Sequence, residues 1–539
     1  MNAQSFHWSK AIQGTFDNKG YCCTADRDGN FCFAGKFSGN VTFGNYELTA
    51  PEEIYSVFLF KTDKDGEILW VKETSHVSSS QSVTPYDIRV DEDNNIFLIG
   101  QYYHQTQFDA ETVLDGYEEG AGDANSDCFI AKYNSNGDLN WAKGFFGPGP
   151  DRLEAIAIGG NTIYVGGSFS NTLNIQGTVI ESDYPGVGNN SNPFILSLST
   201  TGTVNWIDVF HCESGFCREL AFENDQLFYT IEAKDNIWLQ QVGSSEKHPM
   251  KKSTGSWDVY LGCIASTTGI AVWDNLIGSS GSDFNYCLDV HENKVVAGGH
   301  FINEITFESQ DGNLKKATSN GSYDTYFCQY TTEGNLEWIY SLGAEKADGT
   351  FGDLVINPEG DILATGYFMS PEINLGEESI FSGGTEAYVL KLNQYGEFQW
   401  VQQTLSSDNY AQSHALFETQ TGEYQFIGFA RGDCNFMAKD FNLTGDNPAQ
   451  MMFGLIAETQ TAFEEFRAAG IHIYPVPTKD VLKVSAEFPI LKLTLWDLTG
   501  NEVLVAESEK MNLTSVKKGI YILKVDGGYK PVFQRIIKE

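Results

Sequence analysis

An acidic stretch between residues 115 and 127 is rich in potential metal ligands. It reads DGYEEGAGDANSD, and its carboxylates have no evident role in a tight turn. Carboxylate oxygens are the ligands that Ca²⁺ prefers in proteins. The stretch is therefore a candidate calcium site, and Ca²⁺ is the one cofactor that the sequence suggests. Its ligands would come from Asp115, Glu118, Glu119, Asp123 and Asp127.

The sequence carries none of the compact signatures of catalysis. A G-x-S-x-G elbow, an H-E-x-x-H pair and a P-loop are all absent. The histidines are scattered, although His104 in QYYHQ and His300 in GGHFINE take matching places in two repeats. We interpret both as structural residues, so the sequence favours a non-enzymatic protein over an enzyme.

Two of the ten cysteines flank a short loop. Most of the others lie inside apolar runs and are interpreted as small buried residues. Cys212 and Cys217 in HCESGFCREL are close in the chain, which favours a local disulfide if the protein is exported. The stretch lacks the second pair of ligands that a zinc site needs.

The total charge limits the partners. A net charge of −38 excludes nucleic acid as a plausible ligand, because the chain offers no basic surface to displace phosphate counterions. An acidic surface also repels anionic membranes. No run approaches the ~18 apolar residues of a transmembrane helix.

A long repeat must position these side chains. A five-residue phrase, which is Gly followed by any three residues and then Trp, recurs at intervals of about 65 residues. Each phrase follows an apolar run and a polar turn, as in VFLFKTDKDGEILW, which is typical of two strands joined by a tight turn. The phrases end at Trp70, Trp141, Trp206, Trp273, Trp338 and Trp400.

A second phrase, seen as FAGKF, LIGQY, VGGSF, AGGHF and ATGYF, precedes the first, with a turn and another strand before it. Each unit thus contains four antiparallel strands, which is typical of a β-propeller blade. A seventh unit begins near Ser413 but lacks the Trp phrase, and the N-terminal FHWSKAIQG, with Trp8, matches the missing strand. The sequence therefore predicts an all-β, seven-bladed propeller closed by its N-terminal strand.

The fourth unit departs from the repeat. LFYTIEAKDNIWLQ lacks the Gly-x-aromatic phrase, and the connection after it, GSSEKHPMKKSTGS, is locally basic. Such a departure marks a place where a site could lie, and drift of the repeat is the alternative.

The connections between second and third strands vary most, and variable loops on a repeating scaffold are where binding usually resides. Tyrosines in or beside these connections would suit a sugar or protein ligand, with packing inside the loops as the alternative. The candidates are Tyr117, Tyr184 and Tyr323. The connections span 38–56, 103–126, 170–192, 241–256, 302–322 and 369–384.

The repeat resembles the bacterial SBBP-type β-propeller repeats over about residues 5–457. The resemblance implies the propeller fold and says little about function, because propellers host enzymes, binders and scaffolds alike.

After the repeat the chain changes character. We expect a propeller over residues 1–458, a polar linker over 459–470 and a small β-sandwich over 471–539. The sandwich is predicted from short β runs such as IHIYP, VLKVS, LKLTLWD and GIYILKV, which alternate with turns.

The motifs YPVPT, DLTG, GIY and RIIKE, in this order, resemble the type A C-terminal sorting domain of the type IX (Por) secretion system of the Bacteroidetes. The resemblance implies a cleavable signal peptide, and NAQS resembles the surroundings of such a cut after Ala3. It also implies export through the periplasm to the cell surface or extracellular space. The implied partners are the type IX translocon, its outer-membrane shuttle barrel and a sortase. The matching residues are Tyr474, Pro475, Pro477, Thr478, Asp497, Gly500, Gly519, Tyr521 and Lys538.

The sequence thus favours a secreted cargo whose propeller is a non-enzymatic binding or adhesion module. The alternative is a polysaccharide-acting propeller enzyme, a lyase or glycosidase, with acid and base residues at the mouth of the central channel. Carboxylates, His, Tyr and Arg gathered at that mouth would favour the enzyme. A rim of exposed aromatics around a plain centre would favour binding.

Overall fold

The computed structural model contains only β structure in the residues that it describes. The described residues contain no helix, so none of them form a helix that is long and apolar enough to cross a membrane. The chain divides into a larger compact unit, Phe6–Ala457, and a smaller one made of Met1–Ser5 and Glu458–Glu539. The described residues are 4–74, 82–117, 125–183, 190–349, 352–376, 378–406, 410–419, 422–436, 439–441, 449–458, 472–474, 478–485, 490–496, 502–526 and 532–538.

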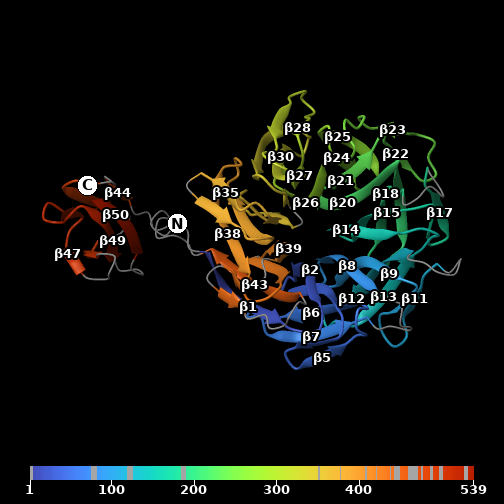
Figure 1. Cartoon of the computed structure of the whole chain (residues 1–539), viewed down its shortest axis with the longest axis horizontal. Coiled ribbons are helices and arrows are strands. Elements are labelled where there is room, and N and C mark those ends of the chain that lie inside the picture. The colour runs from blue at the N-terminus through green and yellow to red at the C-terminus, as the bar shows by residue number, and fades with distance from the viewer. Residues whose placement is uncertain are drawn as a thin grey trace. The chain divides into compact units, whose positions relative to one another are not determined.

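The larger unit is built from antiparallel sheets of four principal strands, which we number 1 to 7 in chain order (Figure 1). Sheets 1 to 3 are β2(Asn18–Ala25)-β3(Phe31–Phe37)-β6(Ser56–Thr62)-β7(Ile68–Glu73), β8(Val83–Val90)-β9(Ile96–Tyr103)-β12(Ser126–Tyr133)-β13(Leu139–Phe145) and β14(Arg152–Gly159)-β15(Thr162–Phe169)-β18(Asn192–Ser199)-β19(Val204–His211). Sheets 4 and 5 are β20(Ser214–Glu223)-β21(Gln226–Lys234)-β24(Asp258–Ala265)-β25(Ile270–Gly278) and β26(Phe284–His291)-β27(Lys294–Phe301)-β30(Asp324–Thr331)-β31(Leu336–Leu342).

In sheet 6 two short strands, β32(Asp348–Gly349) and β33(Leu354–Ile356), both pair with the second strand. They are followed by β34(Ile362–Phe368)-β37(Glu386–Leu392)-β38(Phe398–Ser406). Sheet 7 is β39(Ala411–Glu418)-β40(Tyr424–Ala430)-β43(Gln450–Glu458)-β1(Gln4–Ile12), so its fourth strand comes from the N-terminal end of the chain.

The first strand of each sheet packs beside the first strand of the next, and β39 packs beside β2. Figure 1 shows these first strands gathered around the middle of the unit. Middle strands such as β6, β12 and β18 are buried along almost their whole length because neighbouring sheets cover both of their faces. This is why VFLF, CFIA and FILSL are continuous apolar runs rather than alternating ones.

The Gly-x-x-x-Trp phrase joins neighbouring sheets. Gly137 begins the phrase of sheet 2 in the left-handed region, at φ 81°, and a Cβ placed on it would lie 2.9 Å from the Trp70 ring of sheet 1. Trp70 Nε1 donates to the Ser135 carbonyl in the same turn at 3.2 Å. The glycine thus lets the turn close over the tryptophan of the preceding sheet.

Substitution of Gly334 tests this interpretation. Gly334 has φ 84° and would place a Cβ 2.8 Å from the Trp273 ring, whereas Gly312 has the same φ with no atom within 4 Å. We expect Gly312→Ala to cost about 1 kcal/mol of unfolding free energy from backbone strain alone, and Gly334→Ala about 2–3 kcal/mol. Chemical denaturation of both variants measures the difference, and equal losses would contradict the contact with Trp273.

Strand β1 supplies to sheet 7 the Trp contacts that the other sheets receive from their own fourth strands. Trp8 Nε1 donates to the Lys64 carbonyl at 2.8 Å, and its ring packs against Gly66. Trp400 is the corresponding tryptophan of sheet 6 and lies on the side that faces sheet 7. Its Nε1 is buried and has no hydrogen-bond partner in the described structure. The reason is topological: the third and fourth strands of sheet 7 come from opposite ends of the chain, so no turn between them offers Trp400 a carbonyl.

A hairpin forms between the second and third strands of each sheet. Three of the hairpins extend the outer edge of the preceding sheet, since β22 pairs with β19, β28 with β25 and β41 with β38. Covering an edge in this way removes unpaired backbone groups. In contrast, β11 and β36 contact the fourth strands of their own sheets, β13 and β38. The hairpins are β4(Asn40–Phe43)–β5(Tyr46–Thr49), β10(Gln105–Gln107)–β11(Val113–Asp115), β16(Thr172–Ile175)–β17(Thr178–Glu181), β22(Trp238–Gln241)–β23(His248–Pro249), β28(Glu304–Phe307)–β29(Lys315–Thr318), β35(Glu372–Leu375)–β36(Glu378–Phe381) and β41(Cys434–Phe436)–β42(Lys439–Phe441).

The smaller unit consists of two small sheets around one apolar core that includes Leu482, Leu495, Met511 and Leu523. The first is β44(His472–Tyr474)-β45(Val481–Ser485)-β48(Lys510–Asn512), and the second is β47(Glu502–Ala506)-β46(Lys492–Trp496)-β49(Gly519–Asp526)-β50(Val532–Lys538). The predicted linker, 459–470, lies outside the described residues.

Candidate functional site

A β-bulge interrupts the first strand at the same place in six of the sheets. The unpaired residue falls between Gly20 and Cys22 in β2, and at the corresponding positions of β8, β14, β20, β26 and β39. A bulge re-aims the side chain of its extra residue. The corresponding position of sheet 6 falls beside residues 350 and 351, outside the described part of the chain. We call the six the bulge residues: Tyr21, Tyr86, Glu154, Arg218, Tyr286 and His414.

The bulge residues meet one another because the first strands surround the centre. Arg218 Nη1 lies 2.7 Å from Glu154 Oε1, and its guanidinium is 5.9 Å from the Tyr286 ring. Arg218 Nε also donates to Glu232 at 2.8 Å. On the opposite side, the rings of Tyr21 and His414 are 5.1 Å apart. The centre thus gathers charged and aromatic groups on strands far apart in the sequence.

Burial shifts the proton equilibria of these central groups. Burial lowers the pKa of His414 to about 4, and the positive charges of Lys19 and Lys36 act in the same direction. Burial also raises the pKa of Tyr86 to about 12 and lowers the pKa of Lys36 to about 8. At neutral pH His414 is therefore neutral and Tyr86 protonated.

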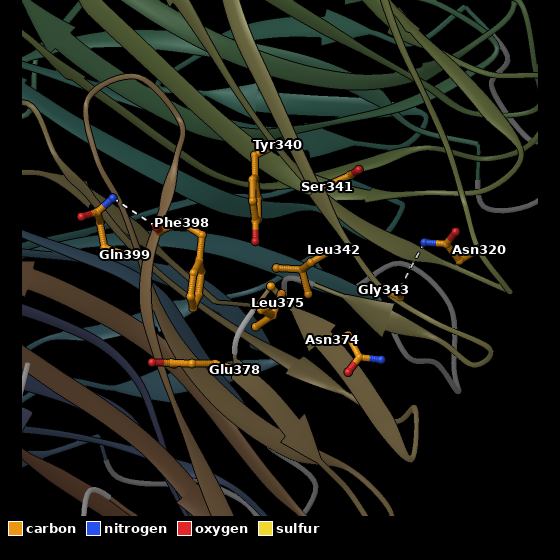
Figure 2. Close-up of a pocket in the computed structure, with 11 residues that line it drawn as sticks. Asn320, Tyr340, Ser341, Leu342, Gly343, Asn374, Leu375, Glu378, Phe398 and Gln399 are labelled. Carbon is orange, nitrogen blue, oxygen red and sulfur yellow. Dashed lines mark hydrogen bonds between the residues drawn. The ribbon is translucent and has the colours of Figure 1, made fainter. Parts of the chain in front are cut away.

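A cleft of about 580 Å³ lies between sheets 5 and 6, where hairpin β35–β36 faces β31. No backbone pairing between this hairpin and β31 occurs in the described residues, unlike the edge pairing of β22, β28 and β41. Figure 2 shows Tyr340 and Phe398 extending toward Leu342, Leu375 and Glu378. The remaining walls carry Asn320, Ser341, Gly343, Asn374, Gly376 and Gln399.

The chemistry of the cleft is mixed. Tyr340 and Phe398 are half-buried and offer aromatic surface, while Asn374 and Gln399 are exposed and offer both donors and acceptors. Burial raises the pKa of Tyr340 to about 12, so its hydroxyl stays protonated at neutral pH. A few polar groups around an apolar floor are typical of a site that binds a small organic ligand.

The tyrosines predicted from the sequence do not line this cleft. The Tyr323 ring packs against His300 at 4.8 Å, and the Tyr117 backbone N–H donates to Asp127 at 2.8 Å. Tyr184 lies outside the described residues. The cleft does use two of the predicted connections, 302–322 and 369–384, through Asn320 and the β35–β36 hairpin. Sequence reasoning missed Tyr340, whose signal is an aromatic two residues after Trp338, where three other repeats carry Lys.

The acidic stretch contributes one buried carboxylate with a structural role. Asp127 accepts the backbone N–H groups of Tyr117 and Gly147, at 2.8 and 3.2 Å, and burial raises its pKa to about 6. Asp258, Asp324 and Glu386 begin other third strands and likewise accept nearby backbone N–H groups. The Asp127 position therefore belongs to the repeat.

The calcium site stays a prediction. The Asp115 carboxylate accepts the Gln105 amide, while Glu118, Glu119 and Asp123 fall outside the described residues. Among the residues that the structure does describe, no group of three or more His, Cys, Asp or Glu side chains could hold a metal ion.

The structure does not contain the predicted disulfide, because Cys212 and Cys217 are both buried free thiols. Cys212 Sγ lies 3.7 Å from Asn192 Nδ2, before β20 begins. Cys217 lies within β20 and packs against Gly166 of sheet 3. Proximity in the chain was misleading because the strand directs the second thiol into the packing between sheets.

Several predicted sorting residues lie in the smaller unit. Thr478 is fully buried and forms a bridge with Lys538, and the Tyr521 hydroxyl donates to the Lys517 carbonyl at 2.9 Å. Gly519 begins β49, and the backbone of Tyr474 ends β44. Pro475, Pro477, Asp497 and Gly500 lie outside the described residues.

Comparison with known proteins assigns this smaller unit. Residues 472–539 match the family described as a secretion system C-terminal sorting domain. That domain marks proteins exported by the type IX system to the cell surface or extracellular space, which is therefore the location of this protein. No curated protein matches the sequence.

Solved structures add only distant similarities. A protein of unknown function from Dyadobacter fermentans is 10% identical, with 85% of this chain and 100% of that chain covered and a TM-score of 0.37. A quinohemoprotein alcohol dehydrogenase from Comamonas testosteroni is 9% identical, with coverage of 89% and 79% and a TM-score of 0.40. Similarities at this level carry no argument about the activity of this chain.

Proposed function

We propose that this protein is a type IX cargo of a member of the Bacteroidetes, and that its larger unit is a closed, seven-bladed propeller of the SBBP type. The support for closure is the contact of β39 with β2, together with the place of β1 in sheet 7. On this proposal the translocon, its shuttle barrel and a sortase recognise the smaller unit. The propeller acts after export.

The propeller is a non-enzymatic module that binds a glycan in the cleft between sheets 5 and 6. The observation that carries this proposal is the pairing of two aromatic side chains, Tyr340 and Phe398, with amides and one carboxylate, Glu378, around the same space. Sugar rings present C–H faces that pack on aromatic surface and hydroxyls that hydrogen-bond amides and carboxylates. Adhesion to a polysaccharide surface is the corresponding biological role.

The centre of the unit favours a second candidate, a polysaccharide lyase or glycosidase. The bulge residues include a carboxylate, an arginine, tyrosines and a histidine, the composition that we associate above with an enzyme. However, Glu154 and Glu232 both bind Arg218, so this pair is not free to work as the acid and base of a glycosidase. Lys36, with a pKa of about 8, would be the base of a lyase.

Glycan binding by the full chain tests the proposal. We expect Tyr340→Ala to weaken binding of a glycan selected on an array at least about fivefold, because a central aromatic contact contributes more than about 1 kcal/mol. Tyr395→Ala is the matched control, since this tyrosine is 69% exposed and lies outside the cleft. Titration calorimetry measures both.

Two results would contradict the proposal. Equal affinities for the Tyr340→Ala and Tyr395→Ala variants would remove the cleft as the binding site. Release of new reducing or unsaturated sugar ends from the bound glycan, lost in Lys36→Met, would replace the binding module with the enzyme.

A further inference from the structure

Asp208 is a buried acid without a counter-charge. It lies in β19 and is 0% exposed, and neither carboxylate oxygen has a hydrogen bond of good geometry in the described structure. The side-chain amide of Gln241, which donates to the Thr268 carbonyl at 2.6 Å, also lies beside the carboxylate and lowers its pKa against the larger effect of burial. A buried acid whose oxygens lack good hydrogen bonds is costly even when it is protonated, so a native structure that retains one calls for an explanation.

The repeat shows what is missing at this position. Two residues after the repeat tryptophan, Lys10 pairs with Glu67 at 2.8 Å, and Lys72 pairs with Asp138 at 3.5 Å. Each acid directly follows the phrase glycine of the next sheet, so the pair connects neighbouring sheets. At the junction of sheets 3 and 4 the lysine position holds Asp208 and the acid position holds Ile270.

This junction also contains a pocket of about 300 Å³. Asp208 and Gln241 line it together with the apolar side chains of Leu239 and Ile270. Gly269 packs closely against both polar side chains, since a Cβ there would lie 2.6 Å from Asp208 Oδ2 and 2.7 Å from Gln241 Nε2. The connection that departs from the repeat, residues 241–256, supplies part of the lining, including Ser244 and Glu246.

The charged side chains around the pocket interact with other groups. Lys247 Nζ lies over the Trp238 ring at 4.7 Å, and His248 Nε2 lies 3.2 Å from Asp274 Oδ1. Glu246, which also lines the pocket, adds negative charge. The lining therefore offers an unpaired acid, an apolar wall and space.

We propose that this pocket binds a primary ammonium group, whose N–H donors pair with Asp208 and supply the counter-charge that it lacks. The alkyl chain of the ligand packs on Leu239 and Ile270. The ammonium comes either from a free amine or from a lysine side chain of another protein. This site is separate from the cleft, and the proposal does not depend on glycan binding.

Calorimetry of the full chain with n-butylammonium tests the site. We expect saturable binding at pH 8.5 and none with tetramethylammonium, which has the same charge but no N–H donor. Burial raises the pKa of Asp208 to about 8, so binding requires loss of its proton. Affinity should therefore fall roughly tenfold for each pH unit between pH 8 and pH 6.

Two variants keep the test decisive. Asp208→Asn preserves the size of the side chain and should abolish both the binding and its pH dependence. The double variant Asp208→Lys with Ile270→Glu installs the lysine–acid pair that two other junctions contain, so it should fold and not bind. Circular dichroism confirms the fold of each variant.

The proposal would be overturned if Asp208→Asn still bound n-butylammonium, or if tetramethylammonium bound equally well. Binding only after Lys247→Ala would also overturn it, since Lys247 would then be the occupant. With binding established, Nα-acetyl-lysine methylamide distinguishes the sources. Tighter binding than n-butylammonium assigns the site to protein lysines, and weaker binding assigns it to free amines.

Discussion

A chain without residues 1–12 is expected to lose cooperative folding of the larger unit, a loss of more than about 5 kcal/mol of unfolding free energy. Strand β1 is the fourth strand of sheet 7, and without it β43 becomes an unpaired edge. The deletion also removes the Trp8 ring from its contacts with Phe31 and Phe453, at 5.8 and 5.9 Å. Thermal melts by circular dichroism and size-exclusion chromatography measure the loss.

Two further chains serve as controls for this deletion. A permuted chain that begins at Gly14 and carries residues 4–12 after Glu458, through a short glycine-rich turn, should fold, because β1 then returns to its place. A chain that ends at residue 458 should melt like the full chain, since the two units are compact by themselves. Normal folding of the deleted chain would contradict the structural role of β1.

Arg218→Met is expected to destabilise the larger unit by about 3–5 kcal/mol at pH 7. Arg218 holds the carboxylates of Glu154 and Glu232, at 2.7 and 2.8 Å, and Glu232 is fully buried. Methionine retains most of the side-chain length but leaves both acids without their cation. The penalty arises from the uncompensated buried charge, and denaturant titration measures it.

The pH dependence of this loss has a definite sign. Burial raises the pKa of Glu232 in the folded protein although Arg218 lowers it, so removing Arg218 raises it further. A carboxyl group whose folded pKa exceeds the unfolded value of about 4.3 contributes stability below that value and loses it as the pH rises through the folded pKa. The difference between variant and wild type should therefore be small near pH 4 and grow toward pH 7.

A triple variant separates charge from packing. Arg218→Met combined with Glu154→Gln and Glu232→Gln removes all three charges of this ion-pair cluster. We expect this variant to recover much of the lost stability, and its stability should depend less on pH. If the triple variant is as unstable at pH 7 as Arg218→Met alone, the loss comes from packing rather than from buried charge.

The sequence by itself determined the kind of structure and the route of export. Gly66, Gly137 and Gly334 allow turns that need positive φ, and the tryptophan of each phrase lies on the strand that follows. These are local features, because turn residues and apolar runs act within a few residues of the chain. The sorting motifs are also local, and the family match over residues 472–539 confirms that domain.

Only the tertiary structure decided where chemistry can occur. Tyr21 and His414 meet at the centre although nearly the whole unit separates them in the chain, and nothing local predicts that their bulges align. The cleft lies where hairpin β35–β36 faces β31 of the preceding sheet without pairing with it, whereas β22, β28 and β41 pair with the sheet before them. Residues that are close in sequence need not meet either: Cys212 and Cys217 are only five positions apart, yet both are free thiols.

The Asp208 pocket depends on both the sequence and the tertiary structure. The sequence marks its neighbourhood as a departure from the repeat, through the connection over 241–256. Its lack of a counter-charge, however, is visible only where two sheets pack, with the apolar Ile270 lining the same pocket. Strand periodicity and turn chemistry are encoded within each unit, whereas a pocket depends on how the side chains of two units pack against each other.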